Sequence, residues 1–536
     1  MGRYAYFPIV LIILAALLHR TLLFYTLYPY YENLVALNPT WLTWQFLPLD
    51  LLRDHLVDAL WYLQQTPPLP HIVLGLIAKL VDSPWGVACV LAALHALISL
   101  VTALLLYKVL VEIALPKFWA CLLVLIFLLS SDVVMLEYNS FGQTFYENLS
   151  MLLLIGVVQQ YLVYSARRLN TGLLTLGVLC AALALTRASF AYFFIVLALM
   201  LLILPQFKWY KLIWFFLPVL IFQGGWALKN DRLYGYFSPA ATSWTGSNLQ
   251  AGMTKRLQGD ELRNSILLQN SDYPPWFVRM TKEKGMVFWI HSWYETYIPA
   301  TIKAQDAALT KKLPGNPPTN SLAQHEVSRW YQKAVMTYAK DHPQDYALGV
   351  LQSYQIFCLP IREYTRLFIN ILFVKKTLSE VWRDSGLQGL LRGDYDFGND
   401  YMMQSPAPQK ILADASKVVP SIQGNAWTLP YLPWLWYCAN MLAIHMAGPL
   451  LLILWLRSCR RSADGDFLAC LFLIYVYVAV ISSIAEHDEN NRFRLAVEPI
   501  LTLIGVMVWL GWWRLLKIWQ KDKAATPAAI KNPNSR

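Results

Sequence analysis

The chain has 536 residues, of which 57% are hydrophobic and only 14% are charged, and its mean hydropathy is +0.40. This apolarity excludes a soluble protein of this length, and several runs of about 18 or more apolar residues predict an all-α polytopic membrane protein. The formal net charge of +11 does not indicate nucleic-acid binding, because no Gly-rich phosphate loop, zinc-finger spacing or RNA-binding signature accompanies it.

The N-terminal stretch MGRYAYFPIVLIILAALLHR lacks a small-residue cleavage site, so we expect a retained first helix rather than a signal peptide. Further along the chain, seven cysteines are scattered, most of them in apolar runs, and no CxxC pair occurs. The sequence therefore predicts neither a disulfide framework nor a zinc site.

Ten apolar windows predict membrane spans. They cover approximately residues 6–27, 86–110, 117–131, 146–165, 172–187, 190–205, 211–228, 432–456, 466–485 and 496–515. If these spans alternate in direction, the basic residues that flank them gather on one side, as in Arg167-Arg168 and Arg460-Arg461. The positive-inside rule makes that side cytoplasmic, so both termini are expected inside and the protein in the inner (plasma) membrane.

This topology divides the chain into four parts. The parts are a transmembrane core over 1–228 with an outer loop at 28–85, a large α-rich extracytoplasmic segment over 229–431, C-terminal transmembrane helices over 432–515, and a cytoplasmic tail over 516–536. Within the large segment, residues 365–382 are apolar but carry charges, which predicts an interfacial amphipathic helix rather than a span.

The first outer loop carries three aspartates at helical spacing. Leucines recur every three or four residues from Leu49, which predicts one amphipathic helix over about 50–65 with Asp50 as its N-cap. On such a helix Asp50, Asp54 and Asp58 share one face. A solvated face with a helix cap explains this stripe; a carboxylate poised as a general base at the membrane boundary, its pKa tuned by partial burial, is the functional alternative.

The second outer loop combines acidic and aromatic residues in the stretch MLEYNSFGQTFYENL. It places Glu137, Tyr138, Tyr146 and Glu147 near the end of a span, a combination suited to a polar, ring-shaped ligand such as a sugar. An aromatic belt at the membrane interface is the alternative for the tyrosines.

Some arginines are expected on the outer side, although the basic residues of the other loops gather on the cytoplasmic side. Arg492 and Arg494 precede the last span, and Arg187 in ALTRASF follows the fifth. Arginine forms bidentate hydrogen bonds with phosphate, so an anionic ligand is one explanation. Ion pairs with the acidic residues of the EHDEN stretch are the other.

Taken in order, these motifs resemble the GT-C superfamily of integral-membrane glycosyltransferases. The features are an acidic first loop running into Pro67-Pro68-Leu69, an aromatic-acidic second loop, an R-x-S after span five, and NRFRLAVEP before the last span. The chain looks most similar to the bacterial protein O-mannosyltransferase and aminoarabinose transferase group. The resemblance implies a GT-C-like fold and a polyprenyl-phosphate sugar donor, with a glycan, lipid or protein as acceptor.

The resemblance also implies a site. Its catalytic carboxylate would lie in the first outer loop, where the order of preference is Asp50, Asp54 and then Glu32, with Asp58 lower, because the family's Asp-Glu pair is missing here. Arg492 or Arg494 would stabilise the leaving phosphate. One carboxylate and a single displacement would invert the anomeric carbon, unlike a double displacement. A divalent cation is left open although no clear ligand set is visible, and no other cofactor is expected.

Three other functions compete with this hypothesis. A transporter or flippase of a lipid-linked substrate would place ionisable residues within spans and often contain two related halves, and no repeat is evident here. A polysaccharide polymerase or ligase would share the donor class. A non-catalytic scaffold would use the large outer segment for binding.

Overall fold

The computed structural model describes most of the chain. It covers residues 6–37, 46–129, 133, 142–204, 207–239, 244–256, 261–286, 293–317, 320–358, 441–449, 463–485 and 490–511. Within these ranges the chain is helical and contains no strand. The predicted all-α class is therefore confirmed for the described residues, while the predicted helix over 365–382 lies outside them.

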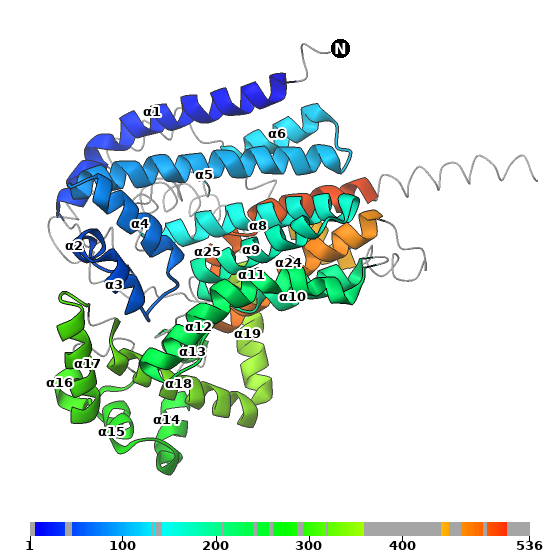
Figure 1. The fold of residues 1–536 in the computed structure, drawn as a ribbon. Coiled ribbons are helices and arrows are strands. Elements are labelled where there is room, and N and C mark those ends of the chain that lie inside the picture. The colour runs from blue at the N-terminus through cyan, green and yellow to red at the C-terminus, as the bar shows by residue number, and fades with distance from the viewer. Residues whose placement is uncertain are drawn as a thin grey trace, which may run out of the picture.

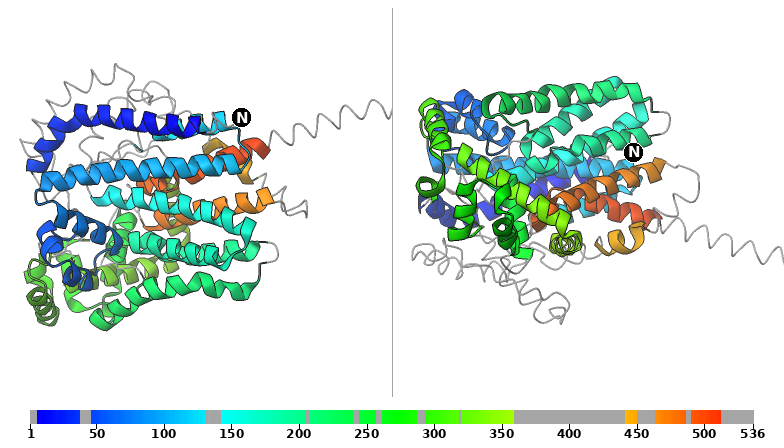
Figure 2. Two further views of the ribbon diagram at one scale, coloured as in Figure 1. Left: turned by 45° about the horizontal axis from the view of Figure 1, so that its top comes forward. Right: turned by 90° about the horizontal axis from the view of Figure 1, so that it is seen from below.

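Long apolar helices run side by side and form a bundle (Figures 1 and 2). The bundle consists of α1 (Phe7–Leu37), α5 (Pro84–Glu112), α6 (Lys117–Leu128), α8 (Gly142–Arg167), α9 (Asn170–Thr186), α10 (Phe193–Ile203), α11 (Leu212–Val219), α12 (Gly225–Tyr234), α24 (Ala463–Ala485) and a helix over Glu498–Gly511. A short helical stretch over 441–449, which contains the π-helical turn Ala443–Ala447, packs in the same core.

Four stretches of the described chain are long and apolar enough to cross a membrane. They are Pro84–Glu112, Phe145–Arg167, Trp209–Tyr234 and Asp466–Ala485. Six further apolar helices of 10–17 residues accompany them, and five of these fall on windows predicted as spans. Length and composition thus support a polytopic membrane protein, and the full count of ten spans remains a prediction.

Shorter helices form an outer assembly at one end of the bundle (Figure 2). Its first part is α2 (Leu49–Asp54), α3 (Leu56–Trp61) and α4 (Leu69–Leu80). Its second part is α13 (Thr245–Arg256), α14 (Glu261–Leu268), α15 (Pro275–Lys284), α16 (Tyr294–Tyr297), α17 (Ala300–Lys312), α18 (Leu322–Asp341) and α19 (Pro343–Phe357). The second part buries its own core, with Phe277 and Tyr331 at its centre, so it folds around that core rather than as a loose loop.

Two glycines allow the closest helix contacts. A Cβ atom on Gly177 would stand 2.2 Å from the carbonyl oxygen of Phe215, where α9 crosses α11. A Cβ atom on Gly246 would stand 1.7 Å from the carbonyl oxygen of Ser328, where α13 crosses α18. Only glycine lets these backbones approach so closely, and the second contact also holds the outer assembly together.

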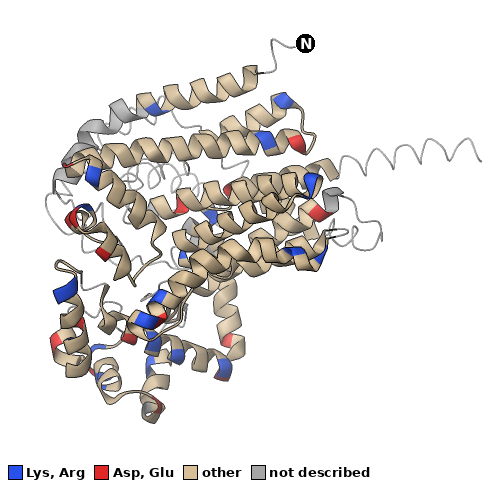
Figure 3. Ribbon diagram, in the orientation of Figure 1, with Lys and Arg blue, Asp and Glu red and all other residues tan. Residues whose placement is uncertain are grey.

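Charges concentrate at the two ends of the bundle and over the outer assembly, whereas the middles of the helices are largely uncharged (Figure 3). Because charged side chains avoid the bilayer core, this distribution fits a bundle that lies across a membrane.

The structure corrects two details of the predicted first loop. The single helix expected over about 50–65 is broken at His55, whose φ of −130° and ψ of 38° end α2 and precede α3. The break lets the Leu56 side chain and the Leu52 carbonyl oxygen both lie against Gly75 of α4. Asp50 is not an N-cap, because α2 already begins at Leu49 and its N-cap position is Pro48.

A third difference concerns the end of the seventh predicted span. The sequence placed the boundary of the outer segment at 228/229, but helix continues to Tyr234 through α12 and ends at Gly235, which has a φ of 73°. The positive φ favours glycine and is typical of a helix C-terminus.

Candidate functional site at the outer end of the bundle

A buried ion pair links the start of one long helix to the end of the next. Glu147, in the first turns of α8, is 1% exposed, and its Oε1 lies 2.7 Å from Nη1 of Arg187. Arg187 directly follows α9, and extended backbone at this position turns its side chain away from the helix. The guanidinium also stacks on the ring of Phe493, 3.8 Å from its centroid, in the short helix α25 (Asn490–Leu495). Three segments far apart in the sequence therefore meet at one cation.

Asn148, the next residue of α8, fixes the position along the helix bundle at which Glu147 forms this ion pair. Asn148 is fully buried and its Nδ2 donates hydrogen bonds to Nδ1 of His95, at 3.0 Å, and to the His95 carbonyl oxygen, at 3.1 Å. Ser99 donates to Asn148 Oδ1 at 3.4 Å. Because both of its partners lie on α5, the amide locks α8 against that helix, and Glu147 is held in one register.

The first outer loop reaches the same place through aromatic contacts. Tyr146, adjacent to Glu147, is buried with its ring centroid 5.2 Å from that of Phe46, and Phe46 lies 4.8 Å from the ring of His71. Thr66 lies beside the Tyr146 phenol. Burial lowers the pKa of His71 to about 3, so this ring is neutral and packs as an aromatic group.

The first loop is also tied to the second part of the outer assembly by one amide side chain. Asn320 Oδ1 accepts from the backbone N–H groups of Gln64 and Gln65, at 2.8 and 3.1 Å. Its Nδ2 donates to the Tyr62 carbonyl oxygen at 3.1 Å and to Asn316 Oδ1 at 2.8 Å. Four hydrogen bonds thus use the whole capacity of this side chain, and three of them hold the loop.

Helix α12 of the bundle also holds this loop, through two hydrogen bonds. Lys229 Nζ donates to the Leu63 carbonyl oxygen at 2.7 Å and lies 3.6 Å from the centroid of the Trp226 ring. The Tyr234 hydroxyl donates to the Tyr62 carbonyl oxygen at 2.7 Å. The loop between α3 and α4 is therefore held rigidly where it approaches Tyr146.

Arg494 belongs to the same end of the bundle but faces inward. It is completely buried, and its Nε donates to Glu498 Oε1 at 2.8 Å. This partner is one helical turn away, and the acidic residues of the EHDEN stretch, named above as alternative partners, lie outside the described residues. The contact between Arg494 and Glu498 thus joins α25 to the start of the next helix, while the ring of the neighbouring Phe493 packs on Arg187.

The first-loop aspartates lie outside this cluster. Asp50, Asp54 and Asp58 are all exposed, and Asp50 pairs with Arg53 at 3.3 Å with 87% of its side chain in contact with solvent. Arg53 is anchored on α4, where its Nε donates to the Ala78 carbonyl oxygen. The partial burial expected to tune a general base is therefore missing at these positions in this conformation, and their catalytic role stays a prediction.

The remaining predicted residues are only partly covered. Glu32 lies on α1 and Arg492 on α25, but their side chains are outside the described part of the structure, as are Glu137 and Tyr138 altogether. Of the nine predicted site residues, the structure brings Tyr146 and Arg187 to the same place through Glu147, which follows Tyr146 and pairs with Arg187, and Arg494 follows the Phe493 ring that covers Arg187.

Sequence reasoning passed over three members of this end of the bundle. Glu147 was named only within the acidic and aromatic stretch suited to a sugar, not as the partner of Arg187, and Asn148 and Asn320 were not named. A polar run, ENLS, at the start of an apolar helix was the available signal for the first two. Asn320 gives no such signal, because its partners are more than 250 residues away in the sequence.

A resident metal ion finds no support at this site. Within the described residues, no group of three or more His, Cys, Asp or Glu side chains is arranged to hold a metal. The two described carboxylates of the cluster, Glu147 and Glu498, are paired with arginines, and no step is assigned to a divalent cation.

In comparisons with known proteins, no family model, curated protein or solved structure matches this chain.

Proposed function

We propose that this protein is an integral-membrane glycosyltransferase that moves a sugar from a polyprenyl-phosphate donor to an acceptor at the outer face of the membrane. One observation carries the proposal. The end of α9 and α25 meet the start of α8 at Arg187, and the first loop packs on the same turn of α8 through Tyr146, although these segments span about 450 residues of sequence. These are the segments whose motifs resemble the GT-C superfamily.

Arg187 is the group best suited to the phosphate in this arrangement. Its guanidinium offers five N–H donors, of which Glu147 can occupy only some, and 12% of the side chain remains in contact with solvent. Stacking on the Phe493 ring fixes the orientation of the planar guanidinium group. A planar, prepositioned cation of this kind stabilises negative charge that develops on a leaving phosphate.

The finer parts of the proposal follow the resemblance. They are a GT-C-like arrangement of ten spans, a location in the inner (plasma) membrane with the site on the extracytoplasmic side, and inversion at the anomeric carbon. A first-loop carboxylate, with Asp50 and Asp54 ahead of Glu32, takes the proton from the acceptor hydroxyl. The acceptor is a glycan, a lipid or a protein.

The test is a transfer assay on the full-length protein in nanodiscs. A panel of labelled polyprenyl-phosphate sugars is supplied, and release of the polyprenyl phosphate is measured with water or added glycans as acceptor. We expect release with one donor, and a loss on the order of 10²-fold in Arg187→Lys, which keeps the charge but not the fork. If polyprenyl phosphate is released from none of the donors, the proposal is wrong.

Arg168→Lys is the matched control for that assay. Arg168 also lies near an aromatic ring, 5.8 Å from the centroid of Tyr164, but between α8 and α9 at the opposite end of the bundle. The same substitution there should leave turnover unchanged. Equal losses in both variants would mean that the effect is structural and does not report on the phosphate.

A transporter remains the second candidate because of one polar cluster beside α24. The Tyr354 hydroxyl of α19 contacts Nε2 of His445, which is exposed, and, at 3.0 Å, the Tyr475 hydroxyl near the middle of α24. Polar, ionisable groups beside the middle of a membrane helix are typical of transport pathways. Movement of a labelled polyprenyl-phosphate sugar across proteoliposomes without cleavage would favour this function.

A further inference from the structure

The stretch Trp209–Tyr234 is not a regular helix. Its α-helical parts α11 and α12 are joined by a π-helical turn over Leu220–Gly224, and Pro218 lies at the end of α11. Proline supplies no N–H and clashes with the preceding turn, which accounts for the local rearrangement of the backbone. Single π-helical turns within α-helices frequently occur at functional sites.

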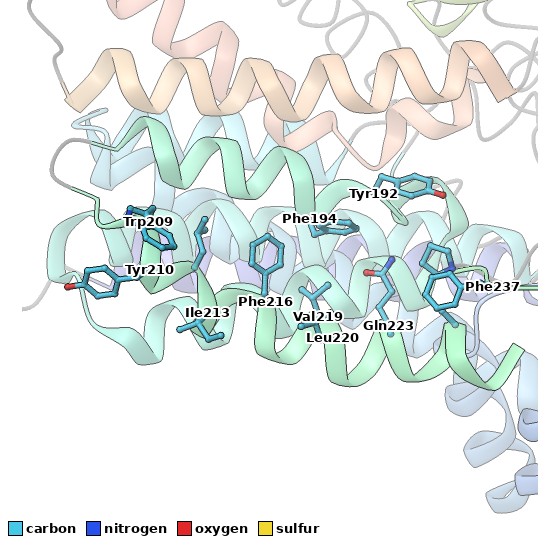
Figure 4. Close-up of a pocket in the computed structure, with 14 residues that line it drawn as sticks. Tyr192, Phe194, Trp209, Tyr210, Ile213, Phe216, Val219, Leu220, Gln223 and Phe237 are labelled. Carbon is cyan, nitrogen blue, oxygen red and sulfur yellow. The ribbon is translucent and has the colours of Figure 1, made fainter. Parts of the chain in front are cut away.

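This distortion borders an apolar groove of about 820 Å³ between α10 and α11–α12 (Figure 4). Trp209 and Tyr210 lie at one end of the groove, Phe237 lies at the other, and Phe194 and Phe216 line its middle. Only 28% of the apolar window of this stretch is buried, the lowest share among the four described candidate spans. The groove therefore lies on a part of the bundle that the bilayer surrounds.

One polar side chain interrupts the apolar lining. Gln223 is 2% exposed, and its Nε2 donates to the carbonyl oxygen of Ala191 at 2.5 Å. A carbonyl can only accept, so this bond fixes which end of the amide is nitrogen, and Oε1 is held on the other side. No donor among the described residues reaches Oε1. Figure 4 shows the amide in the groove, between Phe194 and Phe237.

A buried acceptor without a donor is unfavourable unless a ligand supplies the donor. From Gln223 back to Trp209 the helix runs 14 residues, roughly 21 Å at 1.5 Å per residue, so one extended hydrocarbon chain can lie along it within a hydrocarbon core of about 30 Å. We infer that the groove binds a bilayer lipid whose hydrocarbon chain carries a hydroxyl or amide N–H that donates to Gln223 Oε1.

Two glycines, the last residue of the π-helical turn and the first of α12, leave space beside the groove. Neither Gly224 nor Gly225 has a neighbouring atom within 4 Å of a Cβ position, so a side chain fits at both without disturbing the backbone. Gly224 lines the groove, whereas Gly225 does not. The pair supplies an obstructing variant, Gly224→Phe, and a matched control, Gly225→Phe.

The experiment uses two photoactivatable probes, an octadecanol with a mid-chain diazirine and its methyl ether, which cannot donate. Full-length protein in phosphatidylcholine nanodiscs is labelled with each, and the adducts are located by mass spectrometry. We expect the alcohol to label groove residues about three- to tenfold more than the ether, which is the range for one net neutral hydrogen bond. In Gln223→Leu, which keeps the volume but has no acceptor, the ratio should fall to about one.

The two glycine variants test the location independently. Gly224→Phe should reduce labelling by both probes, and Gly225→Phe should leave it as in the wild type. Equal labelling by alcohol and ether in the wild type, an unchanged ratio in Gln223→Leu, or unimpaired labelling of Gly224→Phe would each overturn the inference. The labelling experiment does not measure sugar transfer. The inference about the groove and the proposed glycosyltransferase function can therefore fail independently of each other.

Discussion

Glu147 and Arg187 form a buried ion pair, with 2.7 Å between Oε1 and Nη1. Burying two charges costs several kcal/mol per ion, and their attraction offsets this only where the geometry is good. The Phe493 ring over the guanidinium and the Asn148 amide on the next residue hold this geometry in place. A pair of this kind is weak evidence for stability alone and is a candidate for a functional role.

We predict that removing either charge singly destabilises the protein strongly. Glu147→Gln or Arg187→Leu leaves an uncompensated buried partner, which costs about 3–5 kcal/mol. The double variant Glu147→Leu/Arg187→Leu should recover most of that loss, because two apolar groups of similar volume replace the pair. Thermal unfolding of the detergent-solubilised protein measures all three.

The double variant also separates structure from function. It should be folded and inactive in the transfer assay if Arg187 serves the donor phosphate. A stable and fully active double variant would show that the pair has no functional role. A double variant as unstable as the singles would contradict the account of compensated burial.

The second prediction concerns the anchor of the first loop. Asn320→Ala leaves the buried N–H groups of Gln64 and Gln65 without their acceptor, at a cost of about 1–3 kcal/mol for each group. Amide hydrogen exchange at residues 62–66 should speed up while exchange within α18 stays slow. Asn320→Asp keeps the acceptor and should protect both amides, losing only the donor to the Tyr62 carbonyl oxygen and to Asn316 Oδ1. Identical exchange in the two variants would contradict the assigned roles.

Much of the helical framework could be predicted because it depends on local sequence. The apolar run predicted over 86–110 forms α5 over Pro84–Glu112, with Ser83 accepting from the Gly86 N–H at its N-cap. Ser and Pro at those positions are ordinary start signals. The window predicted over 466–485 likewise falls within α24, whose apolar length alone indicates a membrane helix.

What could not be predicted depends on contacts between distant segments. The aspartate stripe of the first loop fits one continuous helix by periodicity, but the helix is broken at His55, and the residues on both sides of the break pack against Gly75 of α4. Arg187 was expected to bind phosphate or an acidic partner, and nothing local pointed to Glu147, 40 positions earlier. Its partner depends on how α8 and α9 pack, which a single sequence does not show.

The third prediction is a loss of stability on acidification. Burial, with Arg329 nearby, lowers the pKa of His325 to about 4, and its ring stacks on Tyr236 with centroids 3.8 Å apart. In the unfolded chain the pKa is about 6.5, so between pH 6.5 and 4 the unfolded state binds more protons. His325 alone should therefore lower the free energy of unfolding by on the order of 1–2 kcal/mol from pH 7 to pH 5.

His325→Phe is the matching variant for this prediction. Phenylalanine keeps the stacking on Tyr236 but cannot take up a proton, so its stability should vary less between pH 7 and 5. Glu326, which pairs with Arg329 at 3.4 Å, is unchanged in both proteins. Thermal unfolding at the two pH values decides: equal pH dependence in wild type and variant would assign the effect to other groups.

The fourth prediction tests the topology. Leu268 lies at the end of α14 in the outer assembly and is 84% exposed, whereas Leu169 lies between α8 and α9 and is 57% exposed. A membrane-impermeant maleimide added to intact cells should label Leu268→Cys in a background without other reactive thiols. Leu169→Cys should react only after permeabilisation. The opposite pattern would invert the assigned orientation.

The last prediction concerns the general base. Asp50→Asn keeps the shape of the side chain and removes its ability to accept a proton. Asp50 is exposed and its contact with Arg53 is a surface ion pair, which contributes little to stability, while Arg53 keeps its bonds to the Ala78 and Asp82 carbonyl oxygens. We therefore expect unchanged unfolding and a turnover about 10²–10⁴-fold lower in the transfer assay.

The neighbouring carboxylates determine what the Asp50→Asn result means. Asp58→Asn, also exposed, is the control and should retain activity, whereas Asp54→Asn and Glu32→Gln test the alternatives within the same loop and at the end of α1. If Asp50→Asn is active and one of these two is inactive, the loop supplies the base from a different residue. Normal turnover in Asp50→Asn, Asp54→Asn and Glu32→Gln alike would exclude a first-loop base, and Glu147, the buried carboxylate beside Arg187, would become the group to test.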